Sequence, residues 1–139
     1  MRPTYETSQD LINEQSVISS FCNHWSPLRF EKLPKQYHLD YCLMVGKAVT
    51  GFCEIKIRKN THDKYSTYIL SLAKVSAAKN LQDACGLHSV LVVKWTDRTG
   101  YTSFNYSWPV LVGGRTDRGD WQDVEPVVHI PLSDFKYLD

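Results

Sequence analysis

The sequence predicts an α/β fold in which helices flank a mixed central β-sheet. Residues 49–58 alternate apolar and charged side chains, which is typical of a strand with one buried face. Residues 90–93 form a continuous apolar run after a helical segment, which is typical of a strand covered on both faces. The chain has 139 residues, of which 42% are hydrophobic. That length suffices for one core, so we expect a single domain over residues 1–139.

The periodic segments follow the order αβββαβ and lie at residues 10–21, 29–33, 36–45, 49–58, 71–85 and 89–95. Thr7 or Ser8 is the expected N-cap of the first helix. Ser71 is the expected N-cap of the second helix, and Gly86 is expected to end it. Beyond this core we expect short strands at 101–106 and 127–130, with a polar surface loop at 113–125.

Composition and charge exclude several classes of protein. The formal net charge is +1, so binding of nucleic acid requires a local cluster of basic side chains. No apolar run is long enough to span a membrane, and the first residues lack the apolar core of a signal peptide. We therefore expect no membrane partner and a cytoplasmic location. The cysteines form no C-x-x-C pair, and we expect free thiols at Cys22, Cys42, Cys53 and Cys85.

Three charged residues converge if the second and third strands pair as a hairpin. Glu54 and Lys56 are two apart on one strand, so they project from the same face. A three-residue turn at 46–48 would place Asp40 directly across from Glu54, with their Cβ atoms about 4.5–5.5 Å apart. A two-residue turn would shift the pairing by one and point Asp40 to the other face. Paired carboxylates repel each other without a counterion, and Mg²⁺ (or Mn²⁺) prefers such oxygen ligands.

Lys56 and Glu14 extend this candidate site. Beside a metal-bound water, Lys56 would position or help to deprotonate the water, or stabilise the pentacovalent phosphate. Glu14 interrupts the apolar face of the first predicted helix, where a carboxylate without a partner is costly. Two interpretations stay open for Glu14. It reaches water at the edge of that face, or it completes the site as a supporting carboxylate or as the ligand of a second metal.

The order of these residues resembles the PD-(D/E)XK nuclease superfamily, above all its compact phage and Holliday-junction-resolvase-like members. The resemblance covers residues 10–106 and implies a restriction-endonuclease-like core. It implies that Asp40 is the metal-binding aspartate and that Glu54 and Lys56 are the (D/E)-x-K pair. The sequence departs from the motif where Leu39 stands in place of proline.

The resemblance also implies two further members of the metal site. The backbone carbonyl of Ile55 corresponds to an additional metal ligand, and Glu14 corresponds to the helix glutamate of the resolvase-like branch. The implied activity is Mg²⁺- or Mn²⁺-dependent endonuclease hydrolysis of DNA phosphodiester bonds, structure-specific or of low sequence specificity. A phage origin, a host cytoplasm and a role in DNA repair or recombination fit the resemblance.

Two alternatives to an enzyme stay open. In the first, the chain has the nuclease fold without activity and binds DNA or protein. In the second, the acidic pair is structural and Glu54–Lys56 is a surface ion pair. The complete set of two acids and a lysine favours the enzyme. A homodimer is a further open alternative, because paired incisions of a junction need two active sites.

Several residues near the motif are candidates for contact with DNA. Lys74 lies in the first turn of its helix, where the macrodipole disfavours a cation. Either it binds phosphate together with the helix N-terminus, or it is simply solvated. Ser71 either joins it or only caps the helix. Arg58 and Lys59 either grip the DNA backbone or form a solvated edge. His38, two residues before the motif aspartate on the same predicted strand face, is a candidate to line the site.

Overall fold

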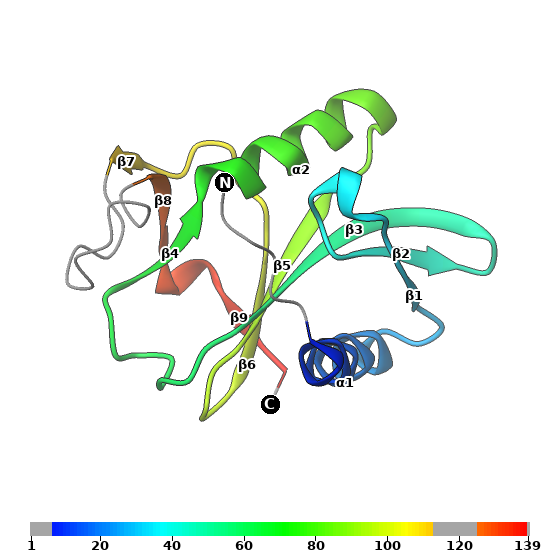
Figure 1. Cartoon of the computed structure of the whole chain (residues 1–139), viewed down its shortest axis with the longest axis horizontal. Helices are drawn as coiled ribbons and strands as arrows, with labels where there is room; N and C mark the ends of the chain where they lie inside the picture. Colours follow the sequence, from blue (N-terminus) through cyan, green and yellow to red (C-terminus); the bar gives the residue numbers. More distant parts are fainter. Residues whose placement is uncertain (1–6, 113–124, 139) are drawn as a thin grey trace.

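A six-stranded mixed sheet organises the fold in the computed structural model, which describes residues 7–112 and 125–138 (Figure 1). Its strands, in their order across the sheet, are β1 (Arg29–Lys32), β2 (Tyr41–Val45), β3 (Ala48–Ile57), β5 (Ser89–Lys94), β6 (Thr99–Ser103) and β9 (Lys136–Tyr137). Among these described strands only β3 and β5 pair in parallel, and the other neighbours are antiparallel. The predicted mixed α/β sheet is therefore confirmed.

A second, three-stranded antiparallel sheet was not predicted as a unit. Its strands are β4 (Thr67–Ser71), β8 (Pro126–Pro131) and β7 (Val110–Val112), in that order. Strand β4 runs directly into helix α2 (Leu72–Cys85), which is followed by β5. The chain thus crosses from β3 through β4 and α2 to β5, as parallel neighbours require. The sequence pattern predicted α2 with its Ser71 cap but missed β4.

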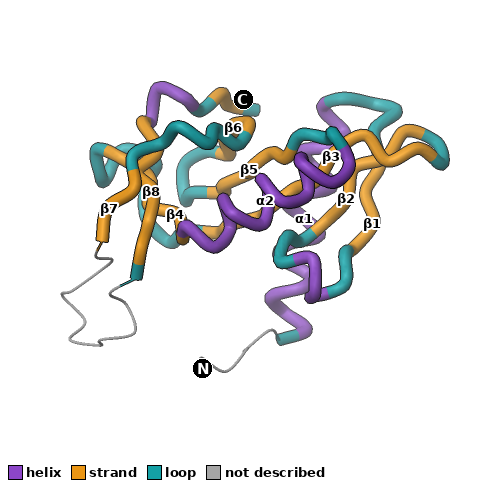
Figure 2. The backbone as a smooth tube through the Cα atoms, turned by 90° about the horizontal axis from the view of Figure 1, so that it is seen from above, coloured by secondary structure: helices purple, strands orange, loops and turns teal. Residues whose placement is uncertain are grey.

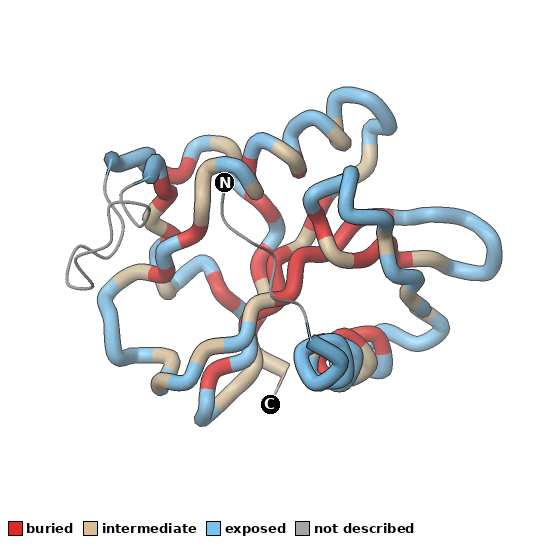
Figure 3. Tube along the Cα trace, viewed as in Figure 1, coloured by how far each residue is buried: buried red, intermediate tan, exposed pale blue. Residues whose placement is uncertain are grey.

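The two α-helices cover opposite faces of the large sheet (Figures 1 and 2). Helix α1 (Ser8–His24) packs Ile18 and Phe21 into one core, which contains Val92 of β5. Helix α2 and the small sheet enclose the other core, which contains Leu91 and Val93. Successive residues of β5 thus alternate between two cores, as the continuous apolar run predicted. Buried segments gather along the central strands (Figure 3).

Both helix caps follow the sequence signals. Thr7 is the N-cap of α1, because its side chain accepts from the Asp10 amide while the Asp10 carboxylate accepts from the Thr7 amide. Ser71 caps α2 by accepting from the Ala73 amide at 3.2 Å. Gly86 ends α2 with a φ of +73°, the left-handed conformation that glycine adopts most readily. The first helix is longer at both ends than the predicted 10–21.

The turn of the β2–β3 hairpin is shorter than predicted. Val45 pairs with Ala48, so the turn contains only Gly46 and Lys47 rather than three residues. Gly46 has a φ of +60°, which suits the first position of a two-residue hairpin turn. By itself this turn would give the register that points Asp40 away from Glu54.

An irregularity in the ladder restores the predicted register before the site is reached. Between Leu43 and Met44 the pairing shifts by one, and Thr50 is the additional residue on β3. Its hydroxyl donates to the Leu43 carbonyl. Tyr41 then pairs with Cys53. One further step of this register sets Asp40 opposite Glu54, so the short turn and the bulge cancel.

The predicted strand over residues 36–45 is wrong in its first half. A 3₁₀ turn, η1 (Lys35–Tyr37), occupies that part, and β2 begins only at Tyr41. His38 ends η1 in the left-handed conformation, with a φ of +62°. It therefore does not share a strand face with Asp40, although it does line the cleft described below. A second 3₁₀ turn, η4 (Leu132–Asp134), precedes β9.

The cysteines are free thiols, as predicted, and three of the four are buried. Burial raises the pKa of the Cys22 thiol to about 11 and raises that of Cys53 as well. None of the helices in the described ranges is long and apolar enough to cross a membrane. The predicted polar loop at 113–125 falls almost entirely on residues outside those ranges.

Gly51→Ala should destabilise the fold by about 1–3 kcal/mol, the usual range for overpacking. A Cβ at this position would lie 2.9 Å from the His88 carbonyl oxygen, which also accepts from the Phe52 amide. Because the clash is with backbone, β3 and the start of β5 must move apart. Urea unfolding followed by circular dichroism measures the change. Lys47→Ala, in the exposed turn, should alter stability by less than about 0.5 kcal/mol. Equal stability of the two variants would contradict the expectation.

Candidate active site

Backbone hydrogen bonds place Asp40 just before β2. Its amide donates to the Cys53 carbonyl at 3.1 Å, and its carbonyl accepts from the Leu33 amide at 2.9 Å. Its side chain is fixed as well, since Oδ2 accepts from the Ile55 amide at 2.8 Å. The side chain remains 20% exposed. With one carboxylate oxygen occupied by the backbone of β3, Oδ1 is the oxygen available to a cation.

Glu54 is a buried acid in the middle of β3, with only 1% of its surface exposed. Its Oε2 lies 3.6 Å from Lys56 Nζ and 3.3 Å from Lys74 Nζ. Its Oε1 is buried and accepts no hydrogen bond from the residues that the structure describes. Burial, followed by the charge of Asp40, raises the pKa of Glu54 from 4.5 to about 7, against the opposing effect of the two lysines. A side-chain contact with Asp40 also contributes to the raised pKa of Glu54.

Lys74 has structural partners that the sequence pattern did not reveal. Besides its ion pair with Glu54, its Nζ donates to the His38 carbonyl at 2.7 Å. It thus joins the start of α2 to the buried acid and to the segment before Asp40. These contacts explain a lysine in the first turn of a helix. Binding of phosphate by Lys74 stays a prediction.

Lys32 is the residue of this site that the sequence interpretation missed. From the end of β1, its Nζ lies 3.2 Å from Glu14 Oε1 and 3.7 Å from Asp40 Oδ1. Glu14 therefore reaches the site through Lys32, and its side chain is 17% exposed. The pairing of β1 with β2 sets Lys32 opposite Tyr41 and next to the aspartate, and no spacing in the sequence indicates this pairing.

A cleft of about 630 Å³ collects most of the predicted site residues. Glu14, Asp40 and Ile55 line it, whereas Glu54 is buried and is not one of the residues that line it. Ser71 does not line it and acts as the helix cap. On a chain with a net charge of +1, basic side chains gather around this cleft. They are Lys32, Lys35, Lys56, Arg58, Lys59 and Lys74.

The donor set at the cleft fits a hard divalent cation. Asp40 Oδ1 and Glu54 Oε1 are carboxylate oxygens, the ligand type that Mg²⁺ and Mn²⁺ favour. A buried carboxylate oxygen without a partner is costly, and a cation would satisfy it. The repulsion that raises the pKa of Glu54 would be relieved at the same time.

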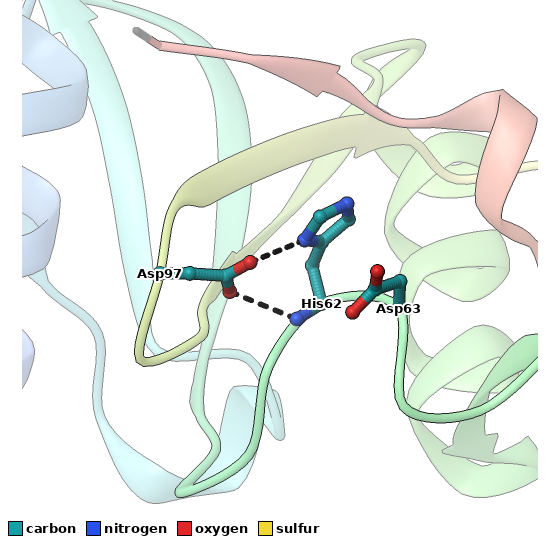
Figure 4. A group of neighbouring side chains, drawn as sticks. All are labelled: His62, Asp63 and Asp97. Atoms are coloured by element: carbon teal, nitrogen blue, oxygen red, sulfur yellow. Dashed lines mark hydrogen bonds and ion pairs between the residues drawn. The ribbon is translucent and has the colours of Figure 1, made fainter.

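A second group of potential ligands lies outside the cleft. His62, Asp63 and Asp97 place their ligand atoms within 4.8 Å of one another, on the loop after β3 and the β5–β6 turn (Figure 4). Asp97 accepts from the His62 amide at 2.9 Å and also contacts His62 Nδ1. This pair ties the loop to the turn and so anchors the segment that follows Arg58. The partners are 35 positions apart in the sequence, and no local pattern indicated their contact.

The fold has a counterpart among solved structures. The chain is similar to Hjc of Archaeoglobus fulgidus, a Holliday junction resolvase from an archaeal hyperthermophile, with a TM-score of 0.50 and 12% identity. The match covers 66% of this chain and 74% of Hjc. At such identity the likeness concerns the fold alone.

The sequence itself places the chain in a family. The model of the family described as "Phage putative PDDEXK endonuclease" matches residues 1–138, so the chain belongs to this family of nucleases. The resemblance inferred from the Asp–Glu–Lys motif is thereby confirmed. No curated protein matches the chain.

In the presence of a chelator, the stability of the wild type should fall as pH rises from about 5 to 8. Because the folded-state pKa of Glu54 is raised to about 7, the folded chain holds this proton more tightly than the unfolded chain. The stabilisation from neutral Glu54 is present at low pH and is lost as pH rises through 7, by about 3 kcal/mol at most. Urea unfolding at several pH values measures it.

Glu54→Gln is the matched control for this pH dependence. Its side chain has nearly the same size and does not titrate, so the unfolding free energy should lack the fall seen in the wild type. Above pH 7 the variant should be the more stable of the two without metal. Parallel pH profiles for the two proteins would show that Glu54 is not a buried acid with a raised pKa.

Proposed function

We propose that this nuclease is a Mg²⁺- or Mn²⁺-dependent endonuclease that hydrolyses phosphodiester bonds in DNA. The observation that carries the proposal is the closeness of Asp40 to the buried Glu54, whose Oε1 accepts no hydrogen bond from the described residues. Asp40 and Lys56 line the cleft beside this acid. A purely structural acid of this kind would be costly. A site for a cation accounts for it.

Asp40, Glu54 and the Ile55 carbonyl are the groups that would hold the cation. When bound, the cation lowers the pKa of a water molecule and neutralises charge on the scissile phosphate. The hydrogen bond from the Ile55 amide fixes the Asp40 carboxylate, so its other oxygen is oriented before any ligand arrives. The two lysines on Glu54 Oε2 hold that side chain in place in the same way.

Lys56 is the residue that we place beside the reacting phosphate. Its ammonium group lies on the cleft side of β3 and is 30% exposed, so it reaches both Glu54 and a ligand in the cleft. There it would orient the attacking water and stabilise the negative charge that develops on phosphate. The other basic side chains around the cleft, above all Arg58 and Lys59, would contact the DNA backbone.

The wild type should nick and linearise supercoiled plasmid with Mg²⁺ or Mn²⁺, and a chelator should abolish cleavage. Asp40→Ala should remove a cation ligand, and Lys56→Ala should remove charge stabilisation. Each should lower the initial rate by about 10²-fold or more. Agarose gels of time courses measure the rate, and a four-way junction added as a substrate tests the activity that Hjc is named for.

Lys79→Ala is the surface control for these variants. Lys79 pairs with Asp83 on the exposed side of α2 and does not line the cleft, so its loss should leave the rate within about twofold. If the folded wild type leaves both plasmid and junction DNA intact with either metal, the proposed endonuclease activity is refuted. DNA binding without cleavage would then favour the alternative of an inactive DNA-binding module.

A further inference from the structure

Lys32 makes contacts that the proposed hydrolysis does not require. Its Nζ lies between Asp40 Oδ1 and Glu14 Oε1, at 3.7 and 3.2 Å, and 4.9 Å from the centre of the Tyr41 ring. Three elements, α1, β1 and the start of β2, meet at this one ammonium group. Its side chain is 37% exposed, so solvent weakens these interactions without removing them.

The two oxygens of Asp40 have different environments. Oδ2 is engaged by the Ile55 amide, while Oδ1 faces Lys32. A divalent cation from the cleft would therefore approach the same oxygen that Lys32 contacts. Two positive groups within about 4 Å of each other repel strongly even at a partly exposed site.

We propose that Lys32 competes with the divalent cation for Asp40 Oδ1 and so is a positioning residue that sets how much cation the site requires. The inference rests on the proposed function, since it presupposes a cation held by Asp40 and Glu54. Cation binding displaces the ammonium group from Asp40, and Glu14 remains as its second partner. Glu14 thus retains Lys32 at the edge of the site.

A purely structural role for Lys32 makes the opposite prediction. If its ion pairs only held Asp40 and Glu14 in place, their loss would loosen the site and weaken cation binding. Competition predicts that loss of the charge tightens binding, because repulsion disappears and Glu14 is released. The sign of the change in affinity separates the two roles.

Calorimetric titration of the full chain with Mn²⁺ at about pH 8 tests this sign. Lys32→Met keeps the length of the side chain and removes its charge. Its affinity should be on the order of tenfold higher than that of the wild type, the change produced by about 1.4 kcal/mol. Lys32→Arg keeps the charge and should bind as the wild type does. The Mn²⁺ concentration for half-maximal plasmid cleavage should fall in Lys32→Met in parallel.

Lys35→Met is the matched control, because Lys35 lines the same cleft without an ion pair to Asp40 among the described contacts. Its affinity should stay within about twofold of the wild type. If folded Lys32→Met binds Mn²⁺ no more tightly than the wild type, the proposal of competition is overturned. Loss of Mn²⁺ binding in Asp40→Ala would still support the cation site at Asp40 and Glu54. If neither the wild type nor Lys32→Met binds Mn²⁺, both proposals fail. Binding by Lys32→Met alone supports competition.

Discussion

The carboxylate of Glu54 is the group around which the rest of the site is arranged. Strand β3 is central in the sheet and carries this acid where water cannot reach it, close to a second acid at Asp40. An isolated ionised carboxylate in such a place would cost several kcal/mol. Ammonium groups from β3 itself and from α2 approach one of its oxygens, so its burial depends on the position of both elements.

The register of the β2–β3 hairpin is the geometric condition for this arrangement. A shift of one residue would turn Asp40 toward α1 and leave Glu54 without its neighbour. The short turn at Gly46 and the additional residue Thr50 each change the register, and only their combination gives the observed pairing. The Asp40–Ile55 hydrogen bond then fixes the aspartate against β3. The turn and the bulge at the far end of the hairpin therefore determine where Asp40 lies in the site.

The sequence predicted those strands whose buried and exposed residues leave a regular pattern of apolar side chains. The alternation at 49–58 and the apolar run at 90–93 identified β3 and β5, because one or two buried faces leave different patterns. The bulge left no comparable signal, since an extra residue in a strand depends on its partner strand. Strand β4 was missed for a similar reason: it is five residues long and pairs with β8, some 60 residues later in the chain.

Strand periodicity predicted that Glu54 and Lys56 share a face, but it did not predict the register that brings Asp40 to them. That register was expected from a three-residue turn, and the structure reaches it through a two-residue turn and a bulge. Lys32 reaches Asp40 and Glu14 only after β1 and α1 have docked, and no spacing in the chain encodes that contact. Prediction from the sequence thus identified the acids and Lys56. It named Lys74 without its ion pair to Glu54, and it missed Lys32.

Lys74 shows how this charge balance overrides a local preference. A cation in the first turn of a helix is unfavourable by about 0.3–1 kcal/mol, which made a structural role difficult to predict. The carboxylate of Glu54 has almost no contact with water, so a second ammonium partner is worth more to it than this local penalty. The fold therefore tolerates a lysine at the unfavourable end of α2, because the helix places it beside Glu54 at the edge of the cleft. Helix α2, the motif strand and the segment before Asp40 are in consequence coupled through one ion pair and the hydrogen bond to His38.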